Sequence, residues 1–472
     1  MVPQSARTSW AAAALADAAP VSLWLDDKDR PEAAPPLTGT RRCDLVVVGG
    51  GYSGLWTALL AKQRDPSREV ILLEGRTIGW AASGRNGGFC SSSLTHGQSN
   101  GMSRYPHDMP RLEQLGRENL AGIIETVEKF GIACDLEHSG ELTVATEPYQ
   151  LEDLQDAYRI AQGFGDDVTL LDQGEIHADI HSPTYVGGLW DRDSTVMVNP
   201  ARLAWGLADA CRSLGVTIFE HSYVDSLVDD GNQIMLTTAH GAVRADRVAL
   251  GTNVFPSLVK RVRPYIIPVY DYAIATEPLS PAQMESIGWS NRQGVGDSGN
   301  QFHYYRLAAD NSILFGGYDA IYHFAGRIDE ALTQRPLTFT KLSEHFFDTF
   351  PQLEGVRFTH QWGGVIDTCS RFYPFFGSAY GGRVSYAVGY TGLGVGATRF
   401  GAQVMLDRLA GVTSDRTELK ALRSTPIPFP PEPIKSAAVQ VTRWSIARAD
   451  ANEGKRNLWL RTLDRFGLGF DS

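Results

Sequence analysis

Residues 43–54 read Cys-Asp-Leu-Val-Val-Val-Gly-Gly-Gly-Tyr-Ser-Gly, and this stretch decides the fold. The β-forming residues at its start predict a buried strand, which ends where the glycines begin. The spacing Gly49-x-Gly51-x-x-Gly54 then predicts a tight turn that opens a helix. A second apolar strand follows and ends at Glu74, about twenty residues beyond the turn, as a dinucleotide-binding fingerprint requires. A glycine turn that serves only helix packing is the alternative interpretation.

Each residue of this fingerprint has a physical role in binding a dinucleotide. Gly49 makes the tight turn, Gly51 lets the backbone approach a pyrophosphate, and Gly54 lets the helix pack closely on the strand. The helix predicted over 55–64 directs free N–H groups and the positive end of its dipole towards that pyrophosphate. Glu74 would accept hydrogen bonds from the adenosine ribose.

The next segment favours FAD over NAD. Residues 79–89 read Gly-Trp-Ala-Ala-Ser-Gly-Arg-Asn-Gly-Gly-Phe, so closely spaced glycines stand beside Ser83, Arg85 and Asn86. The backbone of such a loop can approach a ligand closely. The loop also leaves the carboxyl end of a strand, where α/β sheets bind their ligands. A flexible surface loop is the alternative, and this position argues against it.

The segment from Glu74 to Gly88 resembles the second FAD signature of the D-amino acid oxidase superfamily, and more narrowly its gamma-glutamylputrescine oxidase branch. Further matches lie at 304–317, 350–364 and 389–395, with a weak one at 463–467. The resemblance implies an α/β fold. In it, a Rossmann-like FAD-binding domain carries an inserted α+β substrate domain with an antiparallel sheet, as in D-amino acid oxidase and glutathione reductase.

The resemblance also implies non-covalent FAD. The residues expected to bind it come from the first turn and its acid, the polar loop, two later strand ends and the last glycine turn: Gly49, Gly51, Tyr52, Ser53, Gly54, Glu74, Gly75, Arg76, Ala82, Ser83, Arg85, Asn86, Gly87, Gly88, Val224, Gly251, Thr252, Asn253, Gly389, Thr391, Gly392, Leu393, Gly394 and Val395. The last turn opens a helix whose N–H groups would stabilise negative charge on the flavin, unless it is an ordinary helix start. Family members often carry His where this chain has Leu393.

The predicted domains are discontinuous. The FAD-binding domain is expected to comprise residues 41–90, 199–260 and 360–412, and the substrate domain residues 91–198 and 261–359. An N-terminal extension (1–40), a Pro-rich linker (413–438) and a C-terminal helical tail (439–472) complete the chain. Spacing alone indicates only that βαβ units occur at both ends with β-rich insertions between them.

Composition limits the class of protein. The 472 residues are 43% hydrophobic, which is typical of a soluble globular protein with large cores. A net charge of −11 argues against nucleic-acid binding, and no apolar run is long enough to span a membrane. The five cysteines are scattered and odd in number, so neither a disulfide framework nor a metal site is predicted, and a reducing cytoplasm is expected. The oligomeric state is not predicted.

Candidate substrate-pocket residues are Tyr304, Arg306, Trp362, Tyr390 and Arg371. Tyr304 and Arg306 share one face of a predicted strand, and the arginine could hold a substrate carboxylate bidentately. A structural ion pair for Arg306 and a core position for Trp362 are the alternatives. Cys369 is the candidate for covalent FAD attachment, but it does not align cleanly with the family's attachment site.

These features lead to one functional hypothesis with two alternatives. The first is FAD-dependent oxidation of a primary or secondary amine by hydride transfer to flavin N5. The resulting imine is hydrolysed, and O2 is reduced to H2O2. An amine or amino-acid dehydrogenase with another electron acceptor and a flavin-binding protein without turnover are the alternatives.

Overall fold

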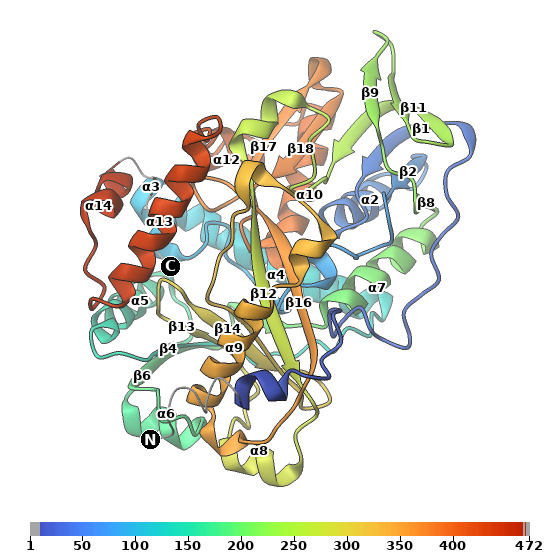
Figure 1. The fold of residues 1–472 in the computed structure, drawn as a ribbon. Helices are drawn as coiled ribbons and strands as arrows, with labels where there is room; N and C mark the ends of the chain where they lie inside the picture. Colours follow the sequence, from blue (N-terminus) through green and yellow to red (C-terminus); the bar gives the residue numbers. More distant parts are fainter. Residues whose placement is uncertain (1–9, 466–467, 469–472) are drawn as a thin grey trace.

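The computed structural model describes residues 10–465 and 468, which form two large sheets with helices packed around them (Figure 1). The first, sheet I, has the strand order β17-β18-β11-β1-β2-β8. Its strands from β18 to β8 run parallel, β17 is antiparallel, and β9 and β10 extend from β11 as an antiparallel ribbon. The strands are β1 (Gly39–Val48), β2 (Val70–Leu73), β8 (Thr217–Phe219), β9 (Ser226–Asp229), β10 (Ile234–Thr237), β11 (Gly241–Leu250), β17 (Phe375–Ala379) and β18 (Val384–Val388).

The second, sheet II, has the strand order β16-β12-β15-β14-β13-β4-β6-β5. All its pairs are antiparallel except β13 with β4, which run parallel. A small third sheet pairs β3 with β7. These strands are β3 (Phe89–Ser91), β4 (Glu141–Ala145), β5 (Val168–Leu171), β6 (Gly187–Asp191), β7 (Thr195–Met197), β12 (Ile267–Thr276), β13 (Gly294–Asp297), β14 (His303–Leu307), β15 (Ile313–Gly317) and β16 (Phe358–Thr368).

The helices begin and end at recognisable signals. Asn199 caps α7 by accepting from the Arg202 N–H at 3.1 Å, and α4 ends at Gly131 with a left-handed backbone (φ 60°). The α-helices are α2 (Tyr52–Arg64), α3 (Gln98–Arg104), α4 (Met109–Phe130), α5 (Gln150–Phe164), α6 (Gln173–Asp179), α7 (Pro200–Ser213), α8 (Pro281–Ile287), α9 (Pro336–Thr349), α10 (Gly394–Ala410), α11 (Asp415–Glu418), α12 (Lys420–Arg423), α13 (Ile434–Asp450) and α14 (Leu458–Arg465).

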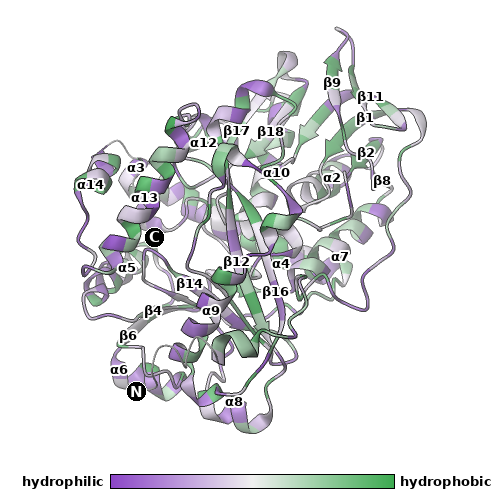
Figure 2. Ribbon diagram, viewed as in Figure 1, coloured by the Kyte–Doolittle hydropathy of each residue, from purple (hydrophilic) through white to green (hydrophobic). Residues whose placement is uncertain are grey.

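Apolar packing joins these elements into layers. One core cluster joins α2, α4, α7 and α10 to one face of sheet I, a second lies on its opposite face, and a third lies between sheet II and α9. The strands of both sheets carry much of the apolar colour in Figure 2. The predicted helix after the glycine turn begins three residues earlier than expected, at Tyr52, because the turn itself starts it.

The domain boundaries follow from strand pairing. The boundary predicted at residue 360 falls inside β16, which pairs with β12 along its length and therefore belongs to sheet II. The chain returns to sheet I only after Thr368. Helices α11 and α12 occupy the first part of the predicted linker, and α13 begins at Ile434, five residues before the predicted tail. Residues 1–9 of the extension, and 466–467 and 469–472 of the tail, lie outside the described residues.

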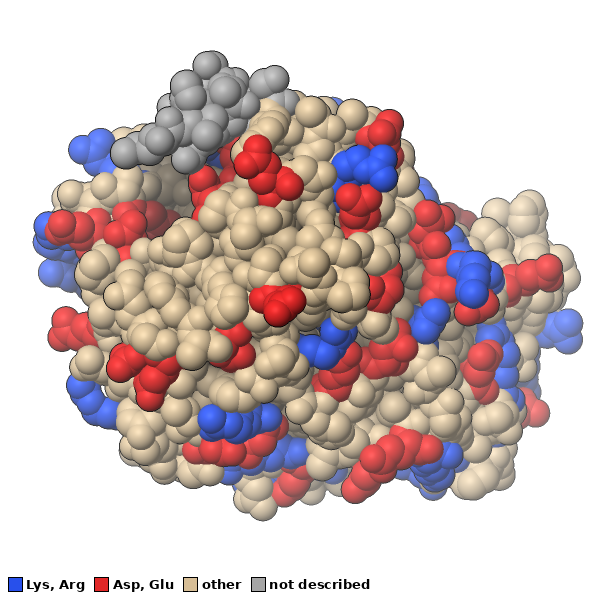
Figure 3. All heavy atoms as spheres, turned by 90° about the horizontal axis from the view of Figure 1, so that it is seen from below, with Lys and Arg blue, Asp and Glu red and all other residues tan. Residues whose placement is uncertain are grey.

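The N-terminal extension packs against the polar loop. Trp24 is buried and donates from Nε1 to the Asn86 carbonyl oxygen at 2.8 Å, while Ser22 donates to the Gly84 oxygen at 2.8 Å. The five cysteines are buried and form no disulfide. Within residues 10–465, no helix is both long and apolar enough to cross a membrane. On the face drawn in Figure 3, basic and acidic side chains are interspersed rather than gathered into a basic patch.

Candidate active site

The glycine turn after β1 has the geometry that a dinucleotide needs. Gly49 has a φ of +111°, and a Cβ there would lie 2.4 Å from the Gly251 oxygen, so only glycine fits. A Cβ on Gly54 would lie 1.8 Å from the Gly49 oxygen, so this glycine keeps α2 close to β1. Gly51 is the N-cap of α2 and supplies no capping side chain. The N-terminus of α2 can therefore present N–H groups to a ligand.

Glu74 lies beside this turn at the carboxyl end of β2. Its carboxylate accepts from the Gly50 N–H at 2.6 Å, the Arg76 N–H at 2.7 Å and Trp80 Nε1 at 3.0 Å. Burial raises the pKa of Glu74, and these donors oppose that shift. A carboxylate has about four acceptor sites, so the group keeps capacity for a ribose hydroxyl.

The polar loop after Glu74 is held mainly by its own side chains. Ser83 Oγ accepts from the Tyr52 N–H at 3.0 Å, which joins the loop to the start of α2. Asn86 donates to the Ala82 oxygen at 2.9 Å, and its Oδ1 accepts from the Gly88 N–H at 2.8 Å. Arg85 donates to the Trp80 oxygen at 2.9 Å and pairs with Glu330. These side chains thus fix the loop, and its residues Ser83, Arg85, Asn86 and Gly87 line the adjoining cavity.

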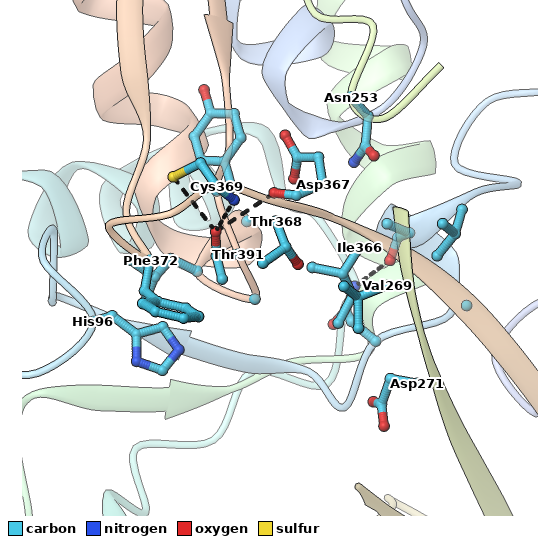
Figure 4. Close-up of a pocket in the computed structure, with 18 of the residues that line it drawn as sticks. His96, Asn253, Val269, Asp271, Ile366, Asp367, Thr368, Cys369, Phe372 and Thr391 are labelled. Atoms are coloured by element: carbon cyan, nitrogen blue, oxygen red, sulfur yellow. Dashed lines mark hydrogen bonds between the residues drawn. The ribbon is translucent and has the colours of Figure 1, made fainter. Parts of the chain in front are cut away.

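A cavity of about 1270 Å³ runs from the glycine turn to sheet II, and part of it is drawn in Figure 4. The residues predicted to bind FAD and found in its lining are Gly49, Gly51, Tyr52, Ser53, Glu74, Gly75, Arg76, Ala82, Ser83, Arg85, Asn86, Gly87, Val224, Gly251, Thr252, Asn253, Thr391, Gly392, Leu393, Gly394 and Val395. Gly54, Gly88 and Gly389 lie behind this lining. These three glycines serve close packing instead.

The last glycine turn brings the N-terminus of α10 to the cavity. Leu393 is the N-cap of α10 and supplies no side-chain hydrogen bond. Asp367, which the sequence analysis missed, is buried in the lining (Figure 4). Its carboxylate accepts from the Gly389 N–H at 2.6 Å. Burial raises the pKa of this carboxyl to about 7. Cys369 also lines the cavity, and its N–H donates to Thr391 Oγ1 at 3.2 Å.

Three predicted pocket residues line the cavity. Tyr304 donates from its hydroxyl to Asp271 Oδ2 at 2.6 Å. Trp362 is buried and donates from Nε1 to the Arg85 oxygen at 2.9 Å, so it connects β16 to the polar loop. Tyr390 is buried, with its hydroxyl 3.4 Å from Ser53 Oγ. The fold therefore brings three of the predicted pocket residues, from three distant segments of the chain, to one cavity.

The two candidate arginines do not reach the cavity. Arg306 is 1% exposed and donates to the carbonyl oxygens of Val198 at 2.8 Å, Leu307 at 3.1 Å and Gly88 at 3.5 Å. Arg371 donates to four backbone carbonyl groups and to Ser424 Oγ. In this structure Arg306 holds β14 to the neighbouring backbone, so the expected grip on a substrate carboxylate is not seen. Strand alternation placed Arg306 on the same face as Tyr304, but a layer of backbone separates it from the cavity.

Carboxylates that the sequence analysis missed line the part of the cavity over sheet II. They are Glu113, Glu141, Asp166, Asp191, Asp271 and Asp319. Burial raises the pKa of Glu141 to about 7 and that of Asp271 to about 6. Neither of these two forms an ion pair within the described part of the chain, whereas the lining cations Lys435 and Arg443 pair with Glu432 and Asp319. The one sequence signal for Asp271 as a cavity residue was its position as the single acidic residue within the mainly apolar strand β12.

The C-terminal helices close one side of this cavity. The lining includes Ala438, Val439, Thr442 and Ile446 of α13 and Leu460 of α14. Tyr322 donates to Glu432 at 2.6 Å, and Asp450 accepts from Asn300, so the helices are tied to the loops of sheet II. The wall that they form therefore borders the part of the cavity over sheet II.

The residues present fit FAD. A Cβ at Gly51 would approach Ser83 Oγ to 2.9 Å, so glycine leaves open the space where a pyrophosphate would meet α2. Thr252 Oγ1 is buried in the lining and has no hydrogen-bond partner among the described residues, as a group awaiting a ligand would be. The structure thus combines a parallel sheet, the glycine turn with its acid, and a cavity that a second sheet covers. This combination defines a dinucleotide-dependent oxidoreductase with a separate substrate domain.

Comparison with known proteins identifies the family. The chain belongs to the DAO family of FAD dependent oxidoreductases, whose family model matches residues 44–408. The chain is 34% identical over 400 residues to gamma-glutamylputrescine oxidoreductase of Escherichia coli K12, covering 82% of this chain and 88% of that protein. It is 31% identical over 398 residues to the probable oxidoreductase OrdL of Haemophilus influenzae, covering 83% and 88%.

The fold agrees with solved structures. Glycine oxidase from Geobacillus kaustophilus superposes with a TM-score of 0.67 at 20% identity, covering 81% of this chain and 99% of that one. The L-proline dehydrogenase of P. horikoshii gives 0.64 at 18% identity, covering 81% and 96%. The predicted family resemblance, fold class and FAD cofactor are therefore confirmed. Helices α13 and α14 lie beyond the residues that the family model matches.

Proposed function

We propose that this FAD-dependent enzyme oxidises a primary or secondary amine at its C–N bond. The product is an imine that water hydrolyses, and O2 is the final oxidant, giving H2O2. The observation that carries the proposal is the continuous cavity, which joins the dinucleotide turn to a chamber lined by six carboxylates. Asp319 and Asp166 form ion pairs, whereas Glu141 and Asp271 form none among the described residues. A protonated amine is the ligand charge that such a chamber favours. The likeness to a gamma-glutamylputrescine oxidoreductase supports the same class of substrate.

The residues of the chain divide the work between the two ends of the cavity. The turn at Gly49 and Gly51, Glu74 and the backbone of the polar loop hold the dinucleotide. Bound FAD would supply the two-electron acceptor for hydride from the substrate. The N-terminus of α10 directs its dipole to the same cavity and stabilises negative charge there. Sheet II and the C-terminal helices orient the amine and limit its access to water.

The test is an anaerobic screen of amines against the purified protein. A substrate should bleach the band of oxidised flavin near about 450 nm. Admission of air should then restore the band, with consumption of O2 and formation of H2O2. Bleaching that air does not reverse would assign the protein to dehydrogenases with another acceptor. A flavin that no amine or amino acid reduces would contradict the proposed activity.

A further inference from the structure

Asp271 lies on the cavity face of β12, towards one edge of sheet II. Val269 and Asp271 line the cavity, whereas Tyr270 and Ile274 pack in the apolar core behind the sheet. Side chains alternate between the two faces of a strand. The alternation therefore directs one carboxylate into the cavity from an otherwise apolar strand, as Figure 4 shows.

Tyr304 reaches this carboxylate across an intervening strand because glycine occupies the crossing point. Tyr304 on β14 pairs with Gly316 on β15, and a Cβ at Gly316 would lie 2.6 Å from the tyrosine ring. The ring crosses β15, and its hydroxyl donates to Asp271 Oδ2 at 2.6 Å. One oxygen of the carboxylate is thereby fixed. An ionised carboxylate has about four acceptor sites, so the pair can still accept hydrogen bonds from a ligand.

The same ring places the pair beside the loop that holds the cofactor. A Cβ at Gly87 would lie 2.8 Å from the Tyr304 ring, and Phe89 packs edge-on against it with ring centroids 6.0 Å apart. Gly87 belongs to the polar loop and lines the cavity. The Asp271–Tyr304 pair therefore lies on the face of sheet II that meets this loop, at the junction of the two ends of the cavity.

No arginine or lysine of the described residues forms an ion pair with Asp271. Each arginine and lysine of the lining has its own acid: Arg76 and Arg85 pair with Glu330, Lys435 with Glu432, Arg443 with Asp319 and Arg456 with Asp464. A buried carboxylate without a cationic partner binds a cationic ligand well, because the ligand repays the cost of its burial. For the same reason, no lining cation is left to hold a carboxylate of the substrate.

Resting on the proposed function, we propose that Asp271 binds the ammonium group of an aliphatic amine and accepts its proton, with Tyr304 as the positioning residue. One N–H bond of the ammonium breaks, an O–H bond forms on the carboxylate, and the electron pair stays on nitrogen. The neutral amine that results has the lone pair needed for loss of hydride from the adjacent carbon. The site favours aliphatic amines over α-amino acids, since it offers no cation for a carboxylate.

The pH dependence of this site follows from its surroundings. Burial raises the pKa of Asp271 to about 6, and the Tyr304 hydrogen bond and nearby His303 oppose the shift, while Asp319 adds to it. The residue opposite Asp271 on β16 is Gly364, which does not titrate. Asp271 is therefore ionised at pH 7, and binding of a cation should weaken as the pH falls through about 6.

The test compares holoenzyme variants by anaerobic rapid mixing with butylamine, and by equilibrium binding of tert-butylamine, which has no hydrogen on the carbon next to nitrogen. Asp271→Asn should weaken tert-butylamine binding about 10- to 100-fold, the scale of a charged hydrogen bond. In the wild type, the rate of flavin reduction per amine concentration should stay level between pH 7 and 9. In Asp271→Asn it should rise about tenfold per pH unit, following the neutral fraction of an alkylamine with a pKa near about 10.4.

Two further variants separate positioning from structure. Tyr304→Phe keeps the carboxylate and should weaken binding less than Asp271→Asn, with the level pH profile retained. Tyr270→Phe removes a hydroxyl group from the opposite face of the same sheet and should change neither binding nor the pH profile. An Asp271→Asn enzyme with full FAD content, wild-type binding and a wild-type pH profile would overturn the site while leaving the proposed function intact. A wild type that neither binds nor is reduced by these amines, or by any amine of the screen, would overturn both.

Discussion

Replacement of Arg306 tests whether this buried arginine is structural or binds substrate. Its guanidinium is 1% exposed, burial lowers its pKa to about 10, and its partners are backbone carbonyl groups of Val198, Leu307 and Gly88. Arg306→Ala removes these charged hydrogen bonds and leaves a cavity, so it should lower the free energy of unfolding by about 3–5 kcal/mol. Arg306→Met fills the space without burying a charge, and should cost only the unsatisfied carbonyl groups, about 1–3 kcal/mol.

Urea unfolding of the apoprotein measures these losses, and the same variants are then assayed with plain and carboxylate-bearing amines. The ratio of kcat/KM for the two kinds of substrate should stay at its wild-type value in every variant that retains FAD. An Arg306→Met enzyme of wild-type stability whose kcat/KM falls selectively, by tenfold or more, for carboxylate-bearing amines would refute a purely structural role for Arg306. That result would return Arg306 to the substrate pocket.

Three further predictions concern the cofactor side of the cavity. Gly51→Val should give a folded, colourless protein, because a branched side chain would meet Ser83 and occupy the open space at α2. The control variant Gly163→Val, at an unobstructed site in α5, should stay yellow. Loss of colour in Gly163→Val would contradict this explanation. Acid precipitation should leave FAD in the supernatant, whereas colour in the pellet would implicate Cys369. In the folded apoprotein the pKa of Asp367 is raised to about 7, whereas in the unfolded chain it is about 4. The protonated carboxyl therefore stabilises the fold below about pH 4, and this contribution is lost as the pH rises to about 7. The Tm of Asp367→Asn relative to wild type should therefore rise over that range, and a constant difference would show that this carboxyl does not titrate as described.

The sequence was most informative where local spacing has one structural solution. Gly49 needs a positive φ and Gly54 a close helix contact, so the order strand, turn, helix and acid correctly predicted the β1–α2–β2 unit of sheet I. The polar loop and the last glycine turn were also found, because glycines next to polar residues at strand ends mark backbone that approaches a ligand. These elements line the cavity, and their contact with FAD stays a prediction.

The substrate side depends on contacts that no local pattern encodes. Alternation placed Tyr304 and Arg306 on one face, but only packing shows that Gly88 and Val198 lie between Arg306 and the cavity. Asp271 reaches Tyr304 solely because Gly316 stands between them in a third strand. The boundary expected at 360 failed for a similar reason, since the membership of β16 in sheet II follows from its partner and not from its own residues.

The most direct test of the account is a crystal structure of the holoenzyme soaked with tert-butylamine. The pyrophosphate of FAD should lie at the N-terminus of α2, with Glu74 on the ribose and the flavin ring beside Gly87 and the start of α10. The amine nitrogen should lie within hydrogen-bond distance, about 2.7–3.2 Å, of an Asp271 oxygen. An amine held by another group, or FAD bound away from this cavity, would contradict the assignment of one cavity to cofactor and amine.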